Sequence, residues 1–134
     1  MSNSLILKNK FKSFNKIITV PGDKSLSIRW VLFSSVALGK SKASNLLLSE
    51  DVLAAINAIR ILGIKVNLNN KFCIIHGNGL GGYKYRKNIV IDAKNSGTLG
   101  RLIMGLLIDT DFKKGELFVS EAYLPGKEKK EKFF

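Results

Sequence analysis

Residue types on which several classes of protein depend are scarce in this sequence. Cysteine occurs once, at position 73 in the apolar stretch FCIIHG, so the chain alone can form neither a disulfide framework nor a zinc cluster. We interpret Cys73 as a reduced thiol in the core. Histidine also occurs once, at position 76. It ends the apolar stretch before Gly77, and we interpret it as a solvated residue at a strand end rather than as a catalytic base.

Long apolar runs are absent as well. No stretch of about 18 apolar residues occurs anywhere in the chain. The apolar piece near the amino terminus, Leu5 to Leu7, is too short for the hydrophobic region of a secretion signal. We therefore expect a cytoplasmic protein with no membrane association.

Acidic side chains are few: 10 Asp and Glu stand against 22 Lys and Arg, which gives a net charge of +12. Such a charge favours an anionic partner, which can be nucleic acid, an acidic membrane surface, or a phosphorylated or carboxylated small molecule. Only four of the basic residues are Arg, the side chain that reads base edges best, and this weakens the case for DNA binding. The 134 residues and 46% hydrophobic content indicate a globular protein the size of one domain.

The first third of the chain predicts a strand, a turn and a helix. Residues 14–20 (FNKIITV) are β-prone and stop at the turn pair Pro21-Gly22. A helix of about three to four turns is predicted from Ser25, with Gly39 just past its end. Its apolar positions recur at helical spacing and are expected to face the core: Leu26, Trp30, Leu32, Phe33, Val36 and Ala37.

The middle of the chain predicts a strand, a helix and a hairpin. Residues 43–48 (ASNLLL) are interpreted as a buried strand. Ser49 then caps a second helix, whose first turn is acidic, as the positive end of a helix prefers. The segments 64–68 and 72–77 are separated by a short polar turn, and we expect them to pair as a hairpin.

The last part predicts one more strand and one more helix. After the glycine-rich loop GNGLGGY, residues 88–92 (NIVID) predict a strand, and a third helix starts at Ser96 or Thr98. The tail begins like a strand and has no helical or strand period past Leu124. This order of elements predicts an α/β fold with mixed sheets, built from βαβαββ units. No residue-level repeat is evident beyond the shared order of elements.

The junction between the first strand and the first helix carries chemistry suited to an anion. The first turn of a helix offers unpaired N–H groups and the positive end of the dipole. Here Lys24 and Arg29 add full charges and Ser25 adds a hydroxyl. Gly22 would let the backbone approach a ligand closely, and Asp23 can serve as the N-cap. A plain capped helix with solvated Lys and Arg explains this stretch equally well.

A second junction has the same residue types. In NSGTLGR, Asn95 and Thr98 can cap or hydrogen-bond, Gly97 permits close approach, and Arg101 lies within the first turns of the third helix. Two strand-to-helix junctions of this kind indicate two helix ends directed at one anionic ligand.

Three segments in this order resemble one enzyme family. PGDKSLSIR, LLLSEDVLAAINAIRILGIKV and IDAKNSGTLGRLIMGLL are similar to the amino-terminal part of the 5-enolpyruvylshikimate-3-phosphate synthases, or 3-phosphoshikimate 1-carboxyvinyltransferases. The resemblance covers Ile17 to Ile108. It implies transfer of the enolpyruvyl group of phosphoenolpyruvate to shikimate 3-phosphate, on the route to chorismate, with no metal or organic cofactor. It also implies the enolpyruvyl transferase fold, of which this chain would be part of one of two halves.

The family pattern implies roles for residues of both motifs. The residues that would hold shikimate 3-phosphate are Lys24, Ser25 and Arg29. The residues that would contact phosphoenolpyruvate are Lys24 and Gly97. The residues that would shape this second site are Asn95, Thr98 and Arg101. Lys94 stands where the family usually has Gly, so the resemblance does not fix the local backbone shape. No catalytic residue is expected in this chain.

The resemblance also suggests how the chain is divided. We expect an amino-terminal strand segment at 1–20, which packs with the other half in relatives, a βαβαββ-type substrate-binding region at 21–120, and a non-family charged tail at 121–134. The family's next arginine-bearing motif is replaced by FVSEAYLPGKEKK. Our hypothesis is that the reading frame was lost near residues 111–115 or that the gene is truncated, which leaves a chain with negligible turnover on its own.

Three alternatives stay open from the sequence alone. A related enolpyruvyl transferase that acts on a UDP-amino sugar shares the fold but has a different first motif. A small basic nucleic-acid-binding domain would explain the charge, and only YKYRK at 83–87 interleaves aromatic and basic residues as such a domain needs. An inactive folded remnant is the third. Relatives are monomeric, whereas this chain is expected to self-associate through exposed apolar surface.

Overall fold

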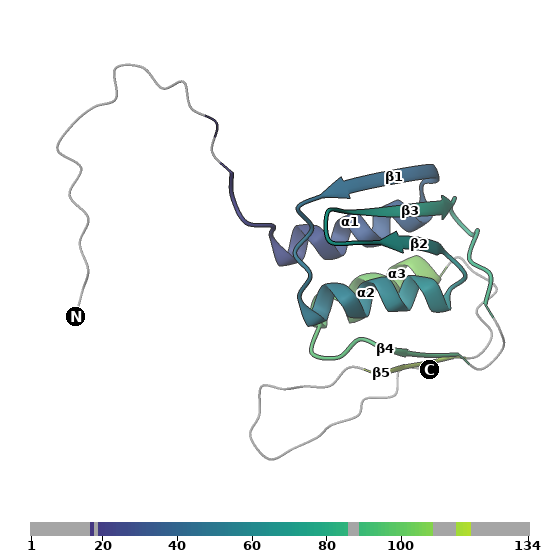
Figure 1. Cartoon of the computed structure of the whole chain (residues 1–134). Coiled ribbons are helices and arrows are strands. Elements are labelled where there is room, and N and C mark those ends of the chain that lie inside the picture. Colours follow the sequence, from purple (N-terminus) through teal and green to yellow (C-terminus); the bar gives the residue numbers. More distant parts are fainter. Residues whose placement is uncertain (1–16, 18, 86–88, 109–114, 119–134) are drawn as a thin grey trace, which may run out of the picture.

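The computed structural model describes residue 17 and residues 19–85, 89–108 and 115–118 of the chain (Figure 1). Helices and strands alternate along most of this part. The elements are α1 (Lys24–Val36), β1 (Leu38–Ser44), α2 (Glu50–Ile61), β2 (Lys65–Leu68), β3 (Phe72–Asn78), β4 (Ile89–Asp92), α3 (Gly97–Leu107) and β5 (Gly115–Phe118). The expected α/β class is confirmed. The strand expected at 14–20 lies mostly outside the described residues, and Ile17, Thr19 and Val20 belong to no strand.

The strands form two small sheets with the helices between them (Figure 1). The first sheet has the order β1-β3-β2, with β3 antiparallel to both neighbours. The second is a parallel pair of β4 and β5, joined through α3. Helix α1 contacts β3, α2 contacts β2 and β4, and all three helices contact one another. The helices therefore fill the middle layer and bury their apolar faces on both sides.

The core forms where the apolar faces of the helices and of the first sheet pack against each other. Cys73 and Ile75 alternate on one face of β3 and are fully buried. All three helices add to the same core aliphatic side chains that are almost completely inaccessible to water: Ile28, Val31 and Leu32 from α1, Val52, Ile56 and Ile59 from α2, and Leu99 and Ile103 from α3. Full burial of each such side chain contributes roughly 1.5–3 kcal/mol, so this cluster holds the layers together.

The predicted orientation of α1 was wrong in part. Leu26 and Phe33, expected in the core, are 66% and 62% exposed. The buried face instead combines Ile28, Val31 and Leu32 with small serines, because α1 passes close to β3 at Gly77. The backbone carbonyls of Ser34 and Ala37 occupy the space that a side chain at position 77 would need. Helix α1 therefore has an apolar face on each side, and the described residues cover only one of them.

The predicted strand at 43–48 was also wrong. The strand β1 occupies Leu38–Ser44 instead, in register with the whole of β3. It ends because Asn45 has a left-handed backbone (φ 60°), which does not continue a strand. The same shift corrects the expected helix end, since Gly39 lies inside β1 and α1 ends at Val36.

Several other predicted elements agree with the structure, but His76, expected at a strand end, lies inside β3 and is paired there with Lys40 and Lys65. The hairpin forms from β2 and β3, and the Asn69 side chain accepts hydrogen bonds from the backbone N–H groups of Lys71 and Phe72 at 2.9 Å each. The second helix begins at Glu50 after Ser49, as expected, but the Ser49 side chain makes no capping hydrogen bond to the described residues, so that part of the prediction was wrong. The third begins at Gly97 with Ser96 as its N-cap.

Candidate anion-binding site

The first turn of α1 is built by Asp23. Its Oδ1 accepts a hydrogen bond from the Leu26 N–H at 2.7 Å, which fixes the start of the helix one residue earlier than Ser25. Lys24 and Ser25 follow in the first turn, and Arg29 lies one turn further on. The Lys24 side chain is 52% exposed, and Arg29 is exposed. All three residues of the first motif are therefore accessible from solvent at the amino end of α1.

The turn that leads into α2 is tied to this helix start. Asn45 Nδ2 donates to the carbonyl of Val20 at 2.9 Å, and the Leu47 N–H donates to Ser27 Oγ at 3.1 Å. A Cβ on Gly22 would lie 2.5 Å from the Asn45 carbonyl oxygen and 2.8 Å from the Leu47 nitrogen. The space at Gly22, which we expected to serve a ligand, is thus taken by the neighbouring backbone.

A third helix start joins the site, which the sequence did not predict. Lys24 Nζ lies 2.9 Å from Asp51 Oδ2 in the first turn of α2. From the sequence we interpreted the acidic first turn of α2 only as a match to the helix dipole. In the sequence the only signal was a pair of adjacent acidic residues, Glu50 and Asp51, directly after Ser49, and this pattern does not say what they face. The fold places them beside the first motif.

The start of α3 carries the second motif. Ser96 Oγ accepts a hydrogen bond from the Leu99 N–H at 3.1 Å. The guanidinium of Arg101 lies over Gly97, where a Cβ would be 3.4 Å from Nη1. Thr98 is partly exposed, and Asn95 and Arg101 are exposed. Arg101 therefore lies within contact distance of the glycine that the family pattern assigns to phosphoenolpyruvate.

Lys94 keeps the backbone shape that a glycine adopts readily. Its φ is 52°, in the left-handed region. Asp92 holds this turn, because its Oδ1 accepts from the Lys94 N–H at 2.8 Å and its Oδ2 lies 2.9 Å from Lys94 Nζ. The departure from the family residue thus leaves a glycine-like turn in place, with an extra cation on the surface.

The electrostatics of this turn follow from the Asp92–Lys94 pair. Desolvation acts to raise the pKa of Asp92, but the side-chain and backbone hydrogen bonds from Lys94 outweigh it and the pKa falls below its ordinary value. The pKa of Lys94 is raised, mainly by the hydrogen bond to Asp92 and further by the charges of Asp92 and Glu50.

The amino ends of α1, α2 and α3 lie at the same end of the molecule (Figure 1), and the three helices pack against one another. Each helix end carries roughly half a positive elementary charge. The fold therefore brings the first motif, with Lys24, Ser25 and Arg29, to the same end as the second motif, with Gly97 and Arg101. Such an end suits a ligand with several negative charges.

The structure also reveals a residue-level repeat that the sequence did not make evident. At α1 and α3 alike, the N-cap side chain accepts from the N–H of a leucine three positions on, namely Leu26 and Leu99. A hydroxyl residue precedes each leucine and a small residue follows it, Ser25 and Ser27 in one case, Thr98 and Gly100 in the other. The two helix starts therefore share one capping pattern.

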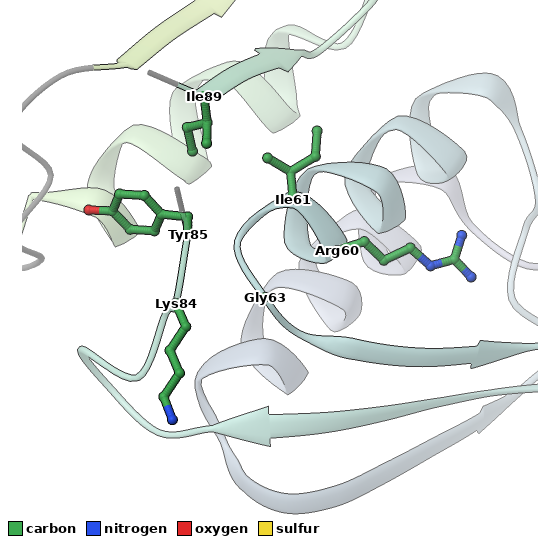
Figure 2. A pocket seen from close by; sticks show the side chains of 6 residues that line it. All are labelled: Arg60, Ile61, Gly63, Lys84, Tyr85 and Ile89. Atoms are coloured by element: carbon green, nitrogen blue, oxygen red, sulfur yellow. The ribbon is translucent and has the colours of Figure 1, made fainter. Parts of the chain in front are cut away.

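A cavity of about 600 Å³ lies elsewhere, beside the carboxyl end of α2 (Figure 2). Its walls are Arg60, Ile61, Gly63, Lys84, Tyr85 and Ile89. The apolar side chains of Ile61 and Ile89 face the gap, whereas Arg60 extends away from it in Figure 2 and its Nη2 donates to the Val66 carbonyl at 3.4 Å. This cavity is apolar in character and far from the helix starts that carry the charged motifs.

In the aromatic and basic stretch at 83–87, the first aromatic side chain is buried. Tyr83 is only 8% exposed, and its hydroxyl lies 2.7 Å from Ser35 Oγ in the core. Burial raises the pKa of Tyr83, and the hydrogen bond to Ser35 offsets part of this. A side chain held in this way cannot stack on a base. Arg86 and Lys87 lie outside the described residues.

The described ranges show neither a metal-binding cluster nor a helix that could span a membrane. In residues 17, 19–85, 89–108 and 115–118, no three His, Cys, Asp or Glu side chains gather closely enough to hold a metal ion. None of the helices α1, α2 and α3, which lie in the same ranges, is long and apolar enough to cross a bilayer.

Comparison with known proteins agrees with the motifs. The EPSP synthase (3-phosphoshikimate 1-carboxyvinyltransferase) family matches residues 8–131. The 3-phosphoshikimate 1-carboxyvinyltransferase of Bacillus cytotoxicus is 44% identical over 101 residues, 75% of this chain and 24% of that protein. That of Streptococcus suis is 40% identical over 107 residues, 80% of this chain and 25% of that protein. The family match ends at residue 131, inside the segment expected to be a non-family tail, whose boundary at 121 stays a prediction.

Solved structures lead to the same family. An EPSP synthase structure from Acinetobacter baumannii superimposes with a TM-score of 0.68 at 35% identity, over 76% of this chain and 23% of that chain. A second structure of EPSP synthase from this organism gives a TM-score of 0.61 at 38% identity, over 67% and 20% of the two chains. The present chain thus spans about a quarter of the length of the curated relatives it matches. By its sequence motifs, its fold and these matches, the chain belongs to the EPSP synthase family of transferases.

Proposed function

We propose that this chain forms part of the substrate-binding wall of a 3-phosphoshikimate 1-carboxyvinyltransferase, which transfers the enolpyruvyl group of phosphoenolpyruvate to shikimate 3-phosphate. The observation that carries the proposal is the gathering of three helix starts and both family motifs at one end of the molecule. Both substrates are multiply charged anions, and helix ends with added Lys and Arg stabilise such charges.

Each motif has its own part in this proposal. Lys24, Ser25 and Arg29 at the start of α1 bind shikimate 3-phosphate, with Lys24 also within reach of phosphoenolpyruvate. Around Gly97 at the start of α3, the second site for phosphoenolpyruvate is shaped by Asn95, Thr98 and Arg101. Preorganised cations of this kind stabilise the charge that develops during the transfer without having to reorganise.

The chain is proposed to bind rather than to turn over its substrates. The described residues supply cations, hydroxyls and helix ends at the site, and the acidic neighbour Asp51 is engaged with Lys24 at 2.9 Å. We expect the groups that transfer protons to come from polypeptide outside this quarter of the enzyme. Phosphoenolpyruvate-dependent release of phosphate by the purified chain, above the background without protein, would contradict this part of the proposal.

A titration of the chain with shikimate 3-phosphate tests the binding role. Loss of one charge-assisted hydrogen bond costs about 1.5–3 kcal/mol, so Lys24→Ala and Arg29→Ala should each weaken binding about tenfold or more. Lys65→Ala is the matched control, because it removes the same charge at the start of β2, at the other end of α2. Equal binding by all four proteins would contradict the proposal.

The same preparation tests the alternative of nucleic-acid binding. An oligonucleotide affinity that falls steeply with salt, together with no response to shikimate 3-phosphate, would favour that alternative. The burial of Tyr83 argues against it. Absence of binding to either ligand by a well-folded chain would favour an inactive remnant.

A further inference from the structure

Asp51, at the start of α2, forms an ion pair with Lys24, at the start of α1. It lies in the first turn of α2, and its Oδ2 is 2.9 Å from the Nζ of Lys24 in the first turn of α1. The carboxylate is the more enclosed partner, with 14% of its side chain exposed against 52% for Lys24. An enclosed anion on a rigid helix thus faces an accessible cation on a flexible stem.

The difference in exposure between the two side chains affects how freely the Lys24 ammonium can move. Its ammonium sits on a four-carbon stem whose rotamer freedom is costly to restrict when a ligand binds. Asp51 is held in place, because it is packed at the start of α2 and interacts favourably with the helix dipole. A fixed carboxylate therefore limits the positions of the Lys24 ammonium before any substrate arrives.

The ion pair between Lys94 and Asp92 is an ordinary surface pair and serves as a comparison for the Lys24–Asp51 pair. Lys94 and Asp92 are also 2.9 Å apart, but both side chains are about half exposed, at 51% and 50%. They lie two residues apart in one turn, whereas Lys24 and Asp51 come from different helices. The Lys24–Asp51 pair therefore links the two helix starts, and the Lys94–Asp92 pair does not.

We propose that Asp51 is a positioning residue, which holds the Lys24 ammonium at the amino end of α1 in the place where it meets the phosphorylated substrate. This inference rests on the proposed function. It extends the substrate-binding wall to α2, which neither family motif assigned to it.

The carboxylate has a second effect that must be separated from positioning. Its negative charge repels any anion, so its removal alone would strengthen binding of all anions to a similar degree. Positioning has a different signature, because it helps only a ligand that must meet the ammonium in one geometry. Inorganic phosphate, which can rotate freely, reports the charge effect, and shikimate 3-phosphate reports both effects.

The first arm of the test measures the ion pair without any substrate. Amine acetylation of the intact chain, read by mass spectrometry, gives the reactivity of each lysine. Asp51→Asn should raise the reactivity of Lys24 several-fold and leave that of Lys94 unchanged, and Asp92→Asn should do the reverse. No change at Lys24 in Asp51→Asn would overturn the inference, whatever the chain binds.

The second arm measures affinity. Immobilising one long side chain costs about 0.5–1.5 kcal/mol, so Asp51→Asn should weaken shikimate 3-phosphate about three- to tenfold relative to inorganic phosphate. Glu50→Gln is the matched control, because it removes the same charge from the exposed neighbouring position and should shift both ligands alike. Parallel shifts of both ligands in Asp51→Asn would overturn the positioning role.

The two arms keep this inference distinct from the proposed function. If the wild-type chain binds neither anion while Asp51→Asn exposes Lys24 to acetylation, the proposed function has failed and the positioning role falls with it, although the ion pair stands. If the wild-type chain binds shikimate 3-phosphate and Lys24→Ala weakens it, but Asp51→Asn does not, only the positioning role is overturned.

Discussion

Asn45 and Val20, 25 residues apart in the chain, are joined by a hydrogen bond in which the Asn45 side chain donates to the Val20 carbonyl at 2.9 Å. Together with the bond from Leu47 to Ser27, it ties the entry to α2 to the entry to α1. The two helix starts are therefore one structural unit, and their geometry depends on residues that carry no charge.

The close approach at Gly22 predicts the first outcome. In Gly22→Ala the new Cβ would meet backbone atoms of Asn45 and Leu47, so the turn must shift, at a cost of about 1–3 kcal/mol in the free energy of unfolding. Urea denaturation measures this. Gly97→Ala is the matched control, because its nearest neighbour at 3.4 Å is the flexible end of Arg101, and it should change stability by less than about 0.5 kcal/mol. Equal stability of the two variants would contradict the packing at Gly22.

The three helix starts differ in how they are capped. Asp23 and Ser96 each accept a hydrogen bond from a backbone N–H in the first turn, whereas Ser49 Oγ is buried and has no hydrogen-bond partner among the described residues. Asp23→Ala and Ser96→Ala should each lower the free energy of unfolding by about 1 kcal/mol.

Ser49→Ala should cost almost nothing, or should stabilise the chain, because it removes a hydroxyl whose burial is not compensated. Thermal or urea unfolding of the three variants side by side gives the comparison. A loss at Ser49→Ala as large as that at Ser96→Ala would show that Ser49 makes a capping bond in solution.

Lys94 is predicted to be a strained residue. A non-glycine side chain with φ 52° is disfavoured, and an exposed ion pair offsets little of this. Lys94→Gly should therefore raise the melting temperature by a few degrees even though it breaks the pair with Asp92. Lys94→Ala, which breaks the pair but keeps a Cβ, is the control and should not. A lower melting temperature for the glycine variant would mean that the ion pair outweighs the strain.

Cys73 is predicted to be inert in the folded chain. It is fully buried, and desolvation raises the pKa of its thiol, although the charge of Arg60 offsets part of this. Because only the thiolate reacts, alkylation by iodoacetamide should be slow in buffer and should speed up steeply through the urea unfolding transition. Rapid alkylation of the native chain would show that the core around β3 opens.

The face of α1 that no described residue covers predicts self-association. Phe33 is 62% exposed on a helix that is apolar on both sides, and added salt screens the mutual repulsion of chains with a net charge of +12. Sedimentation should therefore show association that grows with salt. Phe33→Ser should reduce it, and Leu80→Ser, which removes a single exposed loop residue, should not. Association of equal strength in both variants would place the contact elsewhere.

Much of the candidate site was predictable because its signals are local. A capping residue followed by a helix-period run specifies a helix start whatever surrounds it, and this gave α1, α2 and α3 to within a residue at their amino ends. Both motifs lie at such starts. The ion pair between Lys24 and Asp51 was not predictable, because the two residues are far apart in the sequence and only the packing of α1 on α2 brings them together.

The two errors in the fold have the same origin. Residues 46–48 are as apolar as a buried strand, but β3 forms its backbone hydrogen bonds with Leu38–Ser44. Strand pairing, rather than the apolar composition of 46–48, therefore decided which residues form β1. Likewise α1 offers two apolar faces, and no local rule states which one the sheet will cover.

The sequence alone determined where the helices begin, which residues could bind an anion, and the enzyme family, because caps, turns and motif residues act over a few neighbouring positions. Only the tertiary structure decided which face of α1 is buried, which residues form β1, and that the start of α2 stands beside Lys24. Those outcomes depend on burial and hydrogen bonding between segments that are distant in the chain. Such interactions stabilise the protein only after the layers have packed together.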